Sequence, residues 1–227
     1  MFVKLKVISM KPYPTDEQIK NAYFTNKRLE MISFIPCSCK VILDVGCGEG
    51  NFGSQLKNER RIIVWGIEPD EKASIKAKLV LDQVFTDRFE QAFPDLPKDF
   101  FDCIVFNDVL EHLNDPGTVL KSCLSLLHSN GYIVSSIPNV RYIGNLYELL
   151  VKKDWEYKQG GILDQTHYRF FTQKSIKHLF KSCGYNVIRC EGINPTHSMK
   201  TKLLIWISLG HLSDIKFLQF ATIAQVP

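Results

Sequence analysis

The stretch VILDVGCGEGNFG, residues 41–53, runs from an apolar strand-like segment through Asp44 into glycines at positions 46, 48, 50 and 53. Glycine weakens an ordinary strand or helix by about 0.5–1 kcal/mol relative to alanine. A plain strand-to-helix turn needs only one or two glycines. The sequence therefore predicts a turn whose backbone is approached closely by a ligand.

Strand-like and helix-like segments alternate on both sides of this turn. The strand-like segments are continuously apolar, which is typical of parallel strands that are buried on both faces. The alternation predicts a doubly wound α/β fold in a single domain, residues 1–227, whose ligands bind beyond the carboxyl ends of the strands. The strand-like segments are 40–46, 61–70, 83–87, 99–108, 131–139, 185–192 and 217–225.

Three further segments carry helix or cap signals. Thr15 and Asp16 cap a predicted helical lid over residues 15–36, which Pro36 ends. Residues 115–131 begin with a proline and end at a glycine, so they predict another helix. Residues 139–172 interrupt the alternation and are rich in aromatic and charged residues, and we expect them to form a cap on the substrate side.

Composition excludes several classes of protein. The net charge of +4 is small and evenly spread, which does not indicate a nucleic-acid partner. No apolar run approaches the length of about 18 residues that a membrane span needs. The first ten residues, MFVKLKVISM, make a poor signal peptide. The seven scattered cysteines predict reduced, structural thiols, so we expect a cytoplasmic protein.

The glycine segment has two ligand interpretations. Residues 48–53 read G-x-G-x-x-G, and Glu68 follows at the distance expected for a dinucleotide ribose contact. Asp44 and Glu49 argue against a pyrophosphate, because two like charges about 4 Å apart repel by about 4 kcal/mol at an effective dielectric of ~20. A ligand with an ammonium group and no phosphate fits better. S-adenosylmethionine is such a ligand.

Each part of S-adenosylmethionine has a candidate partner in the sequence. Its ammonium group would meet Asp44, and its carboxylate would meet the N–H groups of the glycine turn. Glu68, at the end of the second strand-like segment, would accept hydrogen bonds from the two ribose hydroxyls. Asp87, at the end of the third, would accept from the adenine amino group, although it could equally be a solvated turn carboxylate.

Four segments together resemble the class I S-adenosylmethionine-dependent methyltransferases: VILDVGCGEGNFG, WGIEPD, FDCIVFNDVLEHLNDP and GYIVSSIPN. The resemblance covers roughly residues 40 to 190. It implies a Rossmann-like methyltransferase fold with a seven-stranded, mostly parallel sheet of order 3-2-1-4-5-7-6, in which the seventh strand is antiparallel. It also implies that the cofactor is bound by Asp44, Gly46, Gly48, Gly50, Glu68, Asp87, Asn107 and Asp108, the last two closing over the sulfonium side.

A second resemblance concerns the acceptor. SIPNVRYIGNLYELL and GGILDQTHYRFFT are similar to a subgroup of these enzymes associated with polysaccharide and other glycan biosynthesis. The resemblance implies O-methylation of a hydroxyl on a sugar or glycan precursor, with S-adenosylhomocysteine as a product. Three alternatives stay open: a small phenol or carboxylate acceptor, a catalytically silent S-adenosylmethionine-binding or scaffold protein, and a dinucleotide-dependent oxidoreductase.

Two histidines are candidates for catalysis. Histidine is well suited to accept a hydroxyl proton near neutral pH. His167 lies in the predicted cap between Asp164 and Arg169, and His112 follows the fourth strand-like segment. We expect His167 and His112 to deprotonate or orient the acceptor. The alternative is that Asp164, His167 and Arg169 only anchor the cap.

A metal site is a further possibility at the same place. Asp108, Glu111 and His112 share one face of a helical turn. Methyltransferases that this sequence resembles, acting on catechol-like or RNA-terminal hydroxyls, use such a D/E-x-x-E-H set to hold a divalent metal, for which His167 would be a fourth ligand. We expect no metal here, and a loop-capping role for Glu111 and His112, because similar LEHL segments occur without one.

Other cap residues have two interpretations each. The aromatic side chains of Trp155, Tyr157 and Tyr168 could stack on an acceptor ring or form the core of the cap. Arg141 and Arg169 could meet a phosphate or carboxylate group on the acceptor.

Overall fold

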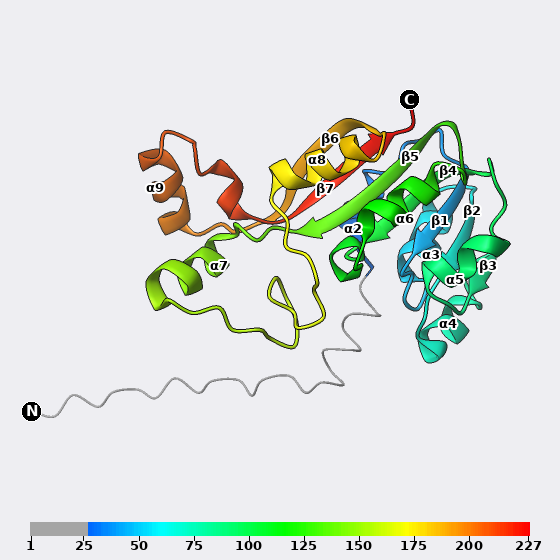
Figure 1. Ribbon diagram of the computed structural model, residues 1–227, viewed down its shortest axis with the longest axis horizontal. Coiled ribbons are helices and arrows are strands. Elements are labelled where there is room, and N and C mark those ends of the chain that lie inside the picture. Colours follow the sequence, from blue (N-terminus) through cyan, green and yellow to red (C-terminus); the bar gives the residue numbers. More distant parts are fainter. Residues whose placement is uncertain (1–26) are drawn as a thin grey trace, which may run out of the picture.

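The computed structural model describes residues 27–227, which form one seven-stranded sheet (Figure 1). The strand order is β3-β2-β1-β4-β5-β7-β6. All neighbouring strands are parallel except β7, which is antiparallel to β5 and to β6. The doubly wound α/β fold and its strand order are therefore confirmed. The strands are β1 (Val41–Val45), β2 (Ile63–Ile67), β3 (Gln83–Phe85), β4 (Phe101–Asn107), β5 (Leu127–Pro138), β6 (Asn186–Pro195) and β7 (Phe217–Gln225).

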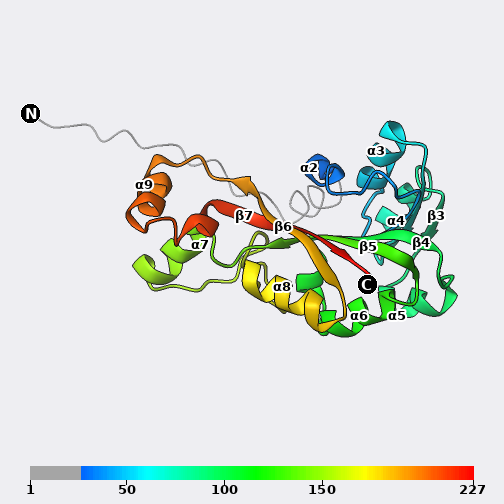
Figure 2. The ribbon, with the colours of Figure 1, turned by 90° about the horizontal axis from the view of Figure 1, so that it is seen from above.

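Helices cover both faces of the sheet (Figure 2). Successive strand residues point to opposite faces, so Ile42 of β1 packs in one core cluster and Leu43 in the other. The first cluster lies under α2 (Leu29–Ile32), α3 (Asn51–Glu59) and α4 (Glu71–Ala77). The second lies under α5 (Phe89–Ala92), the 3₁₀ turn η1 (Phe93–Asp95), α6 (Pro116–Cys123) and α8 (Gln173–Ser182).

The helix predicted over residues 115–131 is shorter than expected. Helix α6 ends at Cys123, and β5 begins at Leu127, opposite Phe101 of β4. The side chain of Leu127 is buried in the core. The prediction of a helix to Gly131 is wrong because the apolar residues before it add to the sheet, where they gain more burial than a helix end would provide.

The predicted helical lid, residues 15–36, lies outside the described residues from 15 to 26. Within the described part, only α2 is α-helical, and Arg28 before it has a left-handed backbone with a φ of 46°. A continuous helix through Arg28 is therefore wrong. The guanidinium group of Arg28 is buried, where it lies 3.0 Å from the carboxylate of Asp108 and donates to the hydroxyl of Ser136 at 2.5 Å. These tertiary contacts override the helical pattern.

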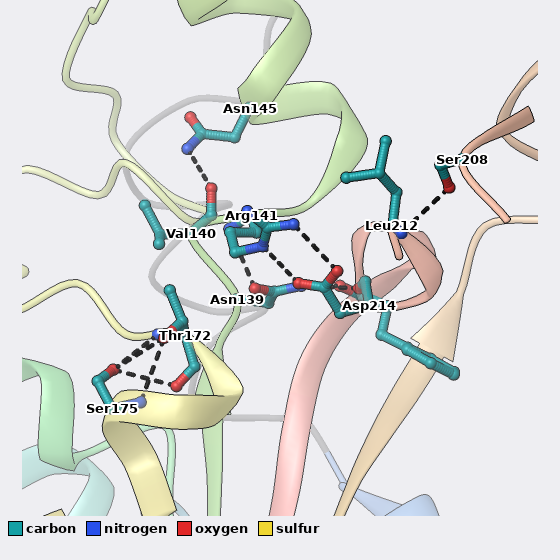
Figure 3. Close-up of polar contacts among 10 residues, drawn as sticks. Asn139, Val140, Arg141, Asn145, Thr172, Ser175, Ser208, Leu212 and Asp214 are labelled. Carbon is teal, nitrogen blue, oxygen red and sulfur yellow. Dashed lines mark hydrogen bonds and ion pairs between the residues drawn. The ribbon is translucent and has the colours of Figure 1, made fainter. Parts of the chain in front are cut away.

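The cap segment, residues 139–172, leaves and rejoins the sheet at adjacent points, since Asn139 bridges to Phe171. It contains α7 (Ile143–Tyr147) and the π-helical turn η3 (Glu148–Lys152). Arg141 at its base forms a bidentate ion pair with Asp214, with Nε–Oδ2 and Nη2–Oδ1 distances of 2.5 and 3.2 Å (Figure 3). Arg141 is therefore engaged by Asp214, and its contact with an acceptor anion stays a prediction.

A second excursion connects β6 to β7. It consists of α9 (Met199–Ile207) and the 3₁₀ turn η4 (Ser213–Lys216). Helices α7 and α9 lie at the end of the molecule far from β3 in both views (Figures 1 and 2). None of the helices between residues 27 and 227 has the length and apolar character needed to cross a bilayer.

All seven cysteines lie in the described region and carry free thiols. Cys37 is exposed. The others are buried, including the five that the sequence places in or beside apolar runs: Cys47, Cys103, Cys123, Cys183 and Cys190.

Candidate cofactor and active site

The glycine turn follows β1 at the carboxyl edge of the sheet. Gly46 and Gly50 have φ angles of 72° and 79°, which side chains rarely tolerate. The N–H group of Gly46 donates to the carbonyl of Ile67 at the end of β2. A Cβ atom at Gly46 would lie 2.6 Å from Val109 Cγ2, so this position has no room for a side chain.

Glu68 joins the glycine turn to the end of β2. Its Oε2 accepts the N–H of Gly48 and its Oε1 accepts the N–H of Asp70, both at 2.8 Å. The residue is 4% exposed and borders a cavity. Because a carboxylate has about four acceptor sites, Glu68 can hold the turn and still accept hydroxyl donors from a ligand.

Asp44 lies at the end of β1 and is 2% exposed. Burial raises the pKa of Asp44 to about 8, and the nearby Glu68 contributes to the rise. Asp44 Oδ2 is buried without a hydrogen-bond partner in the described part of the chain. Glu49, in contrast, is ion-paired with Lys76 at 2.6 Å. Glu49 therefore contributes little to the electrostatic argument against a pyrophosphate.

A cavity of about 510 Å³ opens beside these groups, which is within the usual size range of ligand pockets. Its walls come from the carboxyl ends of β1, β2 and β3, from the segment after β4 and from the cap. It brings three predicted cofactor residues, Gly46, Glu68 and Asp87, together with His112. The lining residues are Val45, Gly46, Ile67, Glu68, Pro69, Asp87, Arg88, Phe89, Glu90, Val109, His112, Leu113, Asn114, Gln165, Thr166 and Tyr168.

Asn107 and Asp108, at the end of β4, differ in their surroundings. Both amide atoms of Asn107 are buried and lack a hydrogen-bond partner among residues 27–227. Asp108 is paired with Arg28 at 3.0 Å and accepts from Gln219 Nε2 at 2.6 Å. Burial raises the pKa of Asp108, and Arg28 opposes the rise. The contact of Asp108 with the cofactor stays a prediction.

Buried polar atoms without a hydrogen-bond partner among the described residues indicate whether S-adenosylmethionine fits the site. Buried polar atoms in native proteins are nearly always hydrogen-bonded, so Asp44 Oδ2 and the Asn107 amide indicate a polar ligand. Asp44 suits an ammonium group and Glu68 suits a diol. The residues present therefore fit the predicted cofactor.

Next to the cavity, His167 is held by the cap backbone. Its Nδ1 lies 3.0 Å from the carbonyl oxygen of Ile162. A carbonyl can only accept, so Nδ1 carries the proton and the Nε2 of neutral His167 has the lone pair. This Nε2 lies 4.0 Å from Glu111 Oε1.

His112 is fixed in the same way. Its Nδ1 lies 3.2 Å from the carbonyl oxygen of Thr166 and 3.1 Å from the hydroxyl of that residue, which itself donates to Asp164. His112 Nδ1 therefore carries a proton. Burial lowers the pKa of His112, and the adjacent His167 lowers it further. The two rings meet edge to face with centroids 4.6 Å apart.

Glu111 completes this group, which we call the acceptor cluster: Glu111, His112 and His167. Glu111 is 1% exposed, and neither carboxylate oxygen has a hydrogen-bond partner within the described chain. Burial raises the pKa of Glu111 well above its ordinary value. One ligand atom from each member lies within 4.8 Å of the others, so the cluster could hold a metal ion.

The cap is attached to the turn that carries two of these residues, η2 (Leu110–His112). The N–H groups of Tyr168 and Arg169 both donate to the carbonyl of Glu111, and Arg169 Nη2 donates to the carbonyl of Asn114 at 2.6 Å. Arg169 therefore anchors the cap, as the sequence alternative proposes, and its predicted contact with an acceptor anion is not seen.

The three cap aromatics separate into two groups. Trp155 and Tyr157 pack against Phe170, with ring centroids 5.5 and 6.2 Å apart, although Tyr157 itself is exposed. Tyr168 is exposed and borders the cavity together with Gln165 and Thr166. No sequence argument placed Gln165 and Thr166 at the cofactor cavity, although both lie in the GGILDQTHYRFFT segment.

The raised pKa of Asp44 makes a testable prediction. Below pH 8 the side chain is mostly protonated, and an ammonium group bound beside it favours the carboxylate, so cofactor binding at pH 7 is expected to release about one proton. Calorimetry of S-adenosylmethionine binding should then give enthalpies that differ between phosphate and Tris buffers. Asp44→Asn should remove the difference, and Asp99→Asn, at an exposed site, should keep it. Equal enthalpies for the unmodified protein in both buffers would contradict the assignment.

Comparisons with known proteins identify the family of the chain. The family model described as "Methyltransferase domain" matches residues 17–189, more than half of the chain. A protein named ubiquinone biosynthesis O-methyltransferase from Histophilus somni (strain 2336) is 38% identical over 109 residues, 44% of this chain and 45% of that protein. One of the same name from Nitrosomonas europaea is 30% identical over 153 residues, 64% of this chain and 63% of that protein.

The chain thus spans about half to just under two thirds of the length of these curated relatives. A crystal structure of an S-adenosylmethionine-dependent methyltransferase from Archaeoglobus fulgidus superposes with a TM-score of 0.68 at 19% identity, covering 93% of this chain and 94% of that one, which shows the fold alone. The cofactor implied by family and fold is S-adenosylmethionine, as the sequence predicts. On the family match, the chain belongs to the methyltransferase-domain family, of the class I S-adenosylmethionine-dependent type.

Proposed function

We propose that this protein transfers a methyl group from S-adenosylmethionine to a hydroxyl of a small acceptor, and that the acceptor oxygen lies at the acceptor cluster. The observation that carries the proposal is Glu111, a buried carboxylate without a hydrogen-bond partner among the described residues, which lies beside two imidazoles, one of which, His112, lines the cofactor cavity. An unpaired buried carboxylate is costly to the fold, so its position favours a functional role.

The residues of the cluster have separate tasks in this proposal. S-adenosylmethionine supplies a methyl group that is activated by the adjacent positive sulfur. Asp44, Glu68 and the glycine turn orient the cofactor, and well-aligned reactants gain roughly 7–11 kcal/mol over free encounter. His167 Nε2 takes the proton of the acceptor hydroxyl, with Glu111 stabilising the imidazolium that forms. Such a base contributes about 10²–10⁴-fold.

As an alternative to the metal-free base, we propose that the cluster binds a divalent cation, in which case His167 Nε2 would be a ligand and would not take the proton. Both Nδ1 atoms are hydrogen-bonded to backbone carbonyls, an arrangement that fixes metal-binding histidines in known sites. A cation held there would lower the pKa of the acceptor hydroxyl. Asp108 lies outside the set because Arg28 already neutralises it.

For the acceptor we infer a phenolic hydroxyl. Two relatives are named for O-methylation in ubiquinone biosynthesis, and this supports a ring hydroxyl. The sugar or glycan hydroxyl expected from the sequence has no support from these comparisons and ranks second. A cytoplasmic location stays a prediction of the sequence.

The test is release of S-adenosylhomocysteine from the full chain incubated with S-adenosylmethionine, MnCl₂ or MgCl₂, and one of two acceptor panels. Catechols and hydroxybenzoates form the first panel, and free, nucleotide-linked and lipid-linked sugars form the second. We expect turnover with the first panel. Turnover with sugars alone would restore the glycan interpretation, and cofactor binding without turnover on either panel would favour the silent binding protein.

A further inference from the structure

Large apolar side chains are exposed together at the end of the molecule formed by η3 and α9 (Figure 1). Trp206 and Leu209, in and just after α9, are 76% and 88% exposed, and Leu150 of η3 is 69% exposed. A groove of about 350 Å³ is lined by Tyr147 of α7, Glu148 of η3 and Leu204 of α9, so η3 and α9 are neighbours. Contiguous exposed apolar surface of this kind marks an interaction site, whereas single exposed apolar residues do not.

This apolar end has a fixed base. The Arg141–Asp214 ion pair connects the segment that enters α7 with the turn that follows α9 (Figure 3). Asn139 Nδ2 donates to the backbone carbonyl of Asp214 as well. Ser208 Oγ accepts the N–H of Leu212 and closes the chain after α9. The exposed side chains therefore project from an anchored support.

The charges beside α9 are basic, whereas those beside η3 are mixed, because Lys152 pairs with Glu148 at 3.0 Å and Asp154 follows Lys153. Lys152 and Lys153 directly follow the apolar residues of η3, and Lys200 and Lys202 lie in the first half of α9. Residues 198–213 contain no aspartate or glutamate. All four lysines are exposed. A partner for this end must accept apolar side chains and carry negative charge.

The shape of α9 narrows the choice of partner. A helix that docks in a protein groove shows one apolar stripe. In α9, Thr201 is the buried residue, and the five consecutive residues 203–207 are all apolar, so that apolar side chains surround this half of the helix and four of the five are exposed. Tryptophan favours the boundary between lipid headgroups and acyl chains, and lysines favour anionic headgroups. An anionic lipid surface meets these requirements together.

We propose that the end formed by η3 and α9 docks on the surface of a membrane that contains anionic lipids, lying in the interface without crossing it. The described helices are too short or too polar to span a bilayer, which agrees with interfacial docking. Element η3 and His167 belong to the same cap, so docking brings the acceptor cluster near the lipid surface. This arrangement suits an acceptor attached to a lipid chain.

The test is flotation of the full chain with vesicles of phosphatidylcholine alone or mixed with phosphatidylglycerol. The unmodified protein is expected to float with the anionic vesicles, less so at high salt. The double variant Leu150→Ser/Trp206→Ser should bind at least about tenfold more weakly. Its control is Leu79→Ser, an apolar residue beside α4 that is 82% exposed. Lys200→Glu/Lys202→Glu should weaken binding to anionic vesicles, and Lys72→Glu on α4 should not.

Three results would overturn the proposal. These are no flotation of the unmodified protein with anionic vesicles, unchanged flotation of Leu150→Ser/Trp206→Ser, or an equal loss in Leu79→Ser. Light scattering gives one more outcome: self-association that Leu150→Ser/Trp206→Ser abolishes, without vesicle binding, assigns this end to a second copy of the chain. Flotation does not require turnover, so its failure and the failure of the proposed methyl transfer can be told apart.

Discussion

Replacing Glu111 by glutamine is expected to lower turnover by about 10²–10⁴-fold while leaving the affinity for S-adenosylmethionine unchanged. Glutamine has nearly the same shape but cannot carry the negative charge that stabilises the imidazolium of His167 or a bound cation. The measurement is initial-rate release of S-adenosylhomocysteine at saturating cofactor, together with calorimetry of cofactor binding. Glu59→Gln, at an exposed acid at the end of α3 outside the cavity lining, is the matched control and should keep normal activity.

The same substitution has a stability signature that separates function from folding. Glu111 is ionised only at a cost in the metal-free protein, because burial raises its folded pKa above the unfolded value. Its contribution to stability is therefore greatest at acidic pH and declines as pH rises toward the raised pKa. Glu111→Gln should match or exceed the unmodified protein in urea unfolding at pH 8 without metal. A variant that loses activity because it unfolds more easily would contradict a functional role.

The effect of divalent cations on the melting temperature is a third measurement of the role of Glu111, after turnover and urea unfolding. If the cluster binds Mn²⁺ or Mg²⁺, either ion should raise the melting temperature of the unmodified protein and not that of Glu111→Gln. Turnover that survives exhaustive chelation, with no thermal shift, would restore the metal-free base that the sequence analysis expects. Full activity in Glu111→Gln would remove the acceptor cluster from the reaction.

Replacing Glu68 by alanine is expected to weaken S-adenosylmethionine binding by about 100-fold or more. Hydrogen bonds to a charged group contribute about 1.5–3 kcal/mol each, and the carboxylate is placed to accept two ribose hydroxyls. It also holds the N–H of Gly48, so its loss loosens the glycine turn. Glu68→Gln should show a smaller loss, because one oxygen can still accept.

Calorimetry with S-adenosylmethionine and with S-adenosylhomocysteine measures both Glu68 variants. Glu71→Gln, three residues further on and exposed, should bind like the unmodified protein. Thermal unfolding of the cofactor-free variants identifies any loss that comes from the fold. An unchanged dissociation constant in Glu68→Ala would place the ribose elsewhere.

Much of the fold was predictable because its signals are local. Continuously apolar strands that alternate with helices specify a parallel sheet, and the glycine turn marks the edge where a ligand binds. Errors arose where tertiary contacts outweighed local pattern. The pattern of residues 124–127 predicts a helix, but Leu127 pairs with Phe101 of β4. Arg28 interrupts a second helical pattern because its guanidinium group is buried against Asp108.

The cofactor half of the site was more predictable than the acceptor half for the same reason. Gly46 and Glu68 follow strands directly, so parallel register alone brings them to one edge of the sheet. His112 and His167 are far apart in sequence, and their 4.6 Å ring contact depends on how the cap returns to η2. No local motif marks Arg28 as the partner of Asp108.

The amino-acid sequence by itself determined the sheet and the cofactor class and supplied the candidate cofactor residues, because strand burial, glycine freedom and carboxylate charge act over a few neighbouring residues. Only the tertiary structure decided which charges are neutralised and which remain unpaired. In the structure, Glu49 forms an ion pair with Lys76, and Asp108 forms one with Arg28. Glu111 lies beside two imidazoles. The physical reason is that a buried charge depends on what lies within a few ångströms of it, and distant segments supply those neighbours.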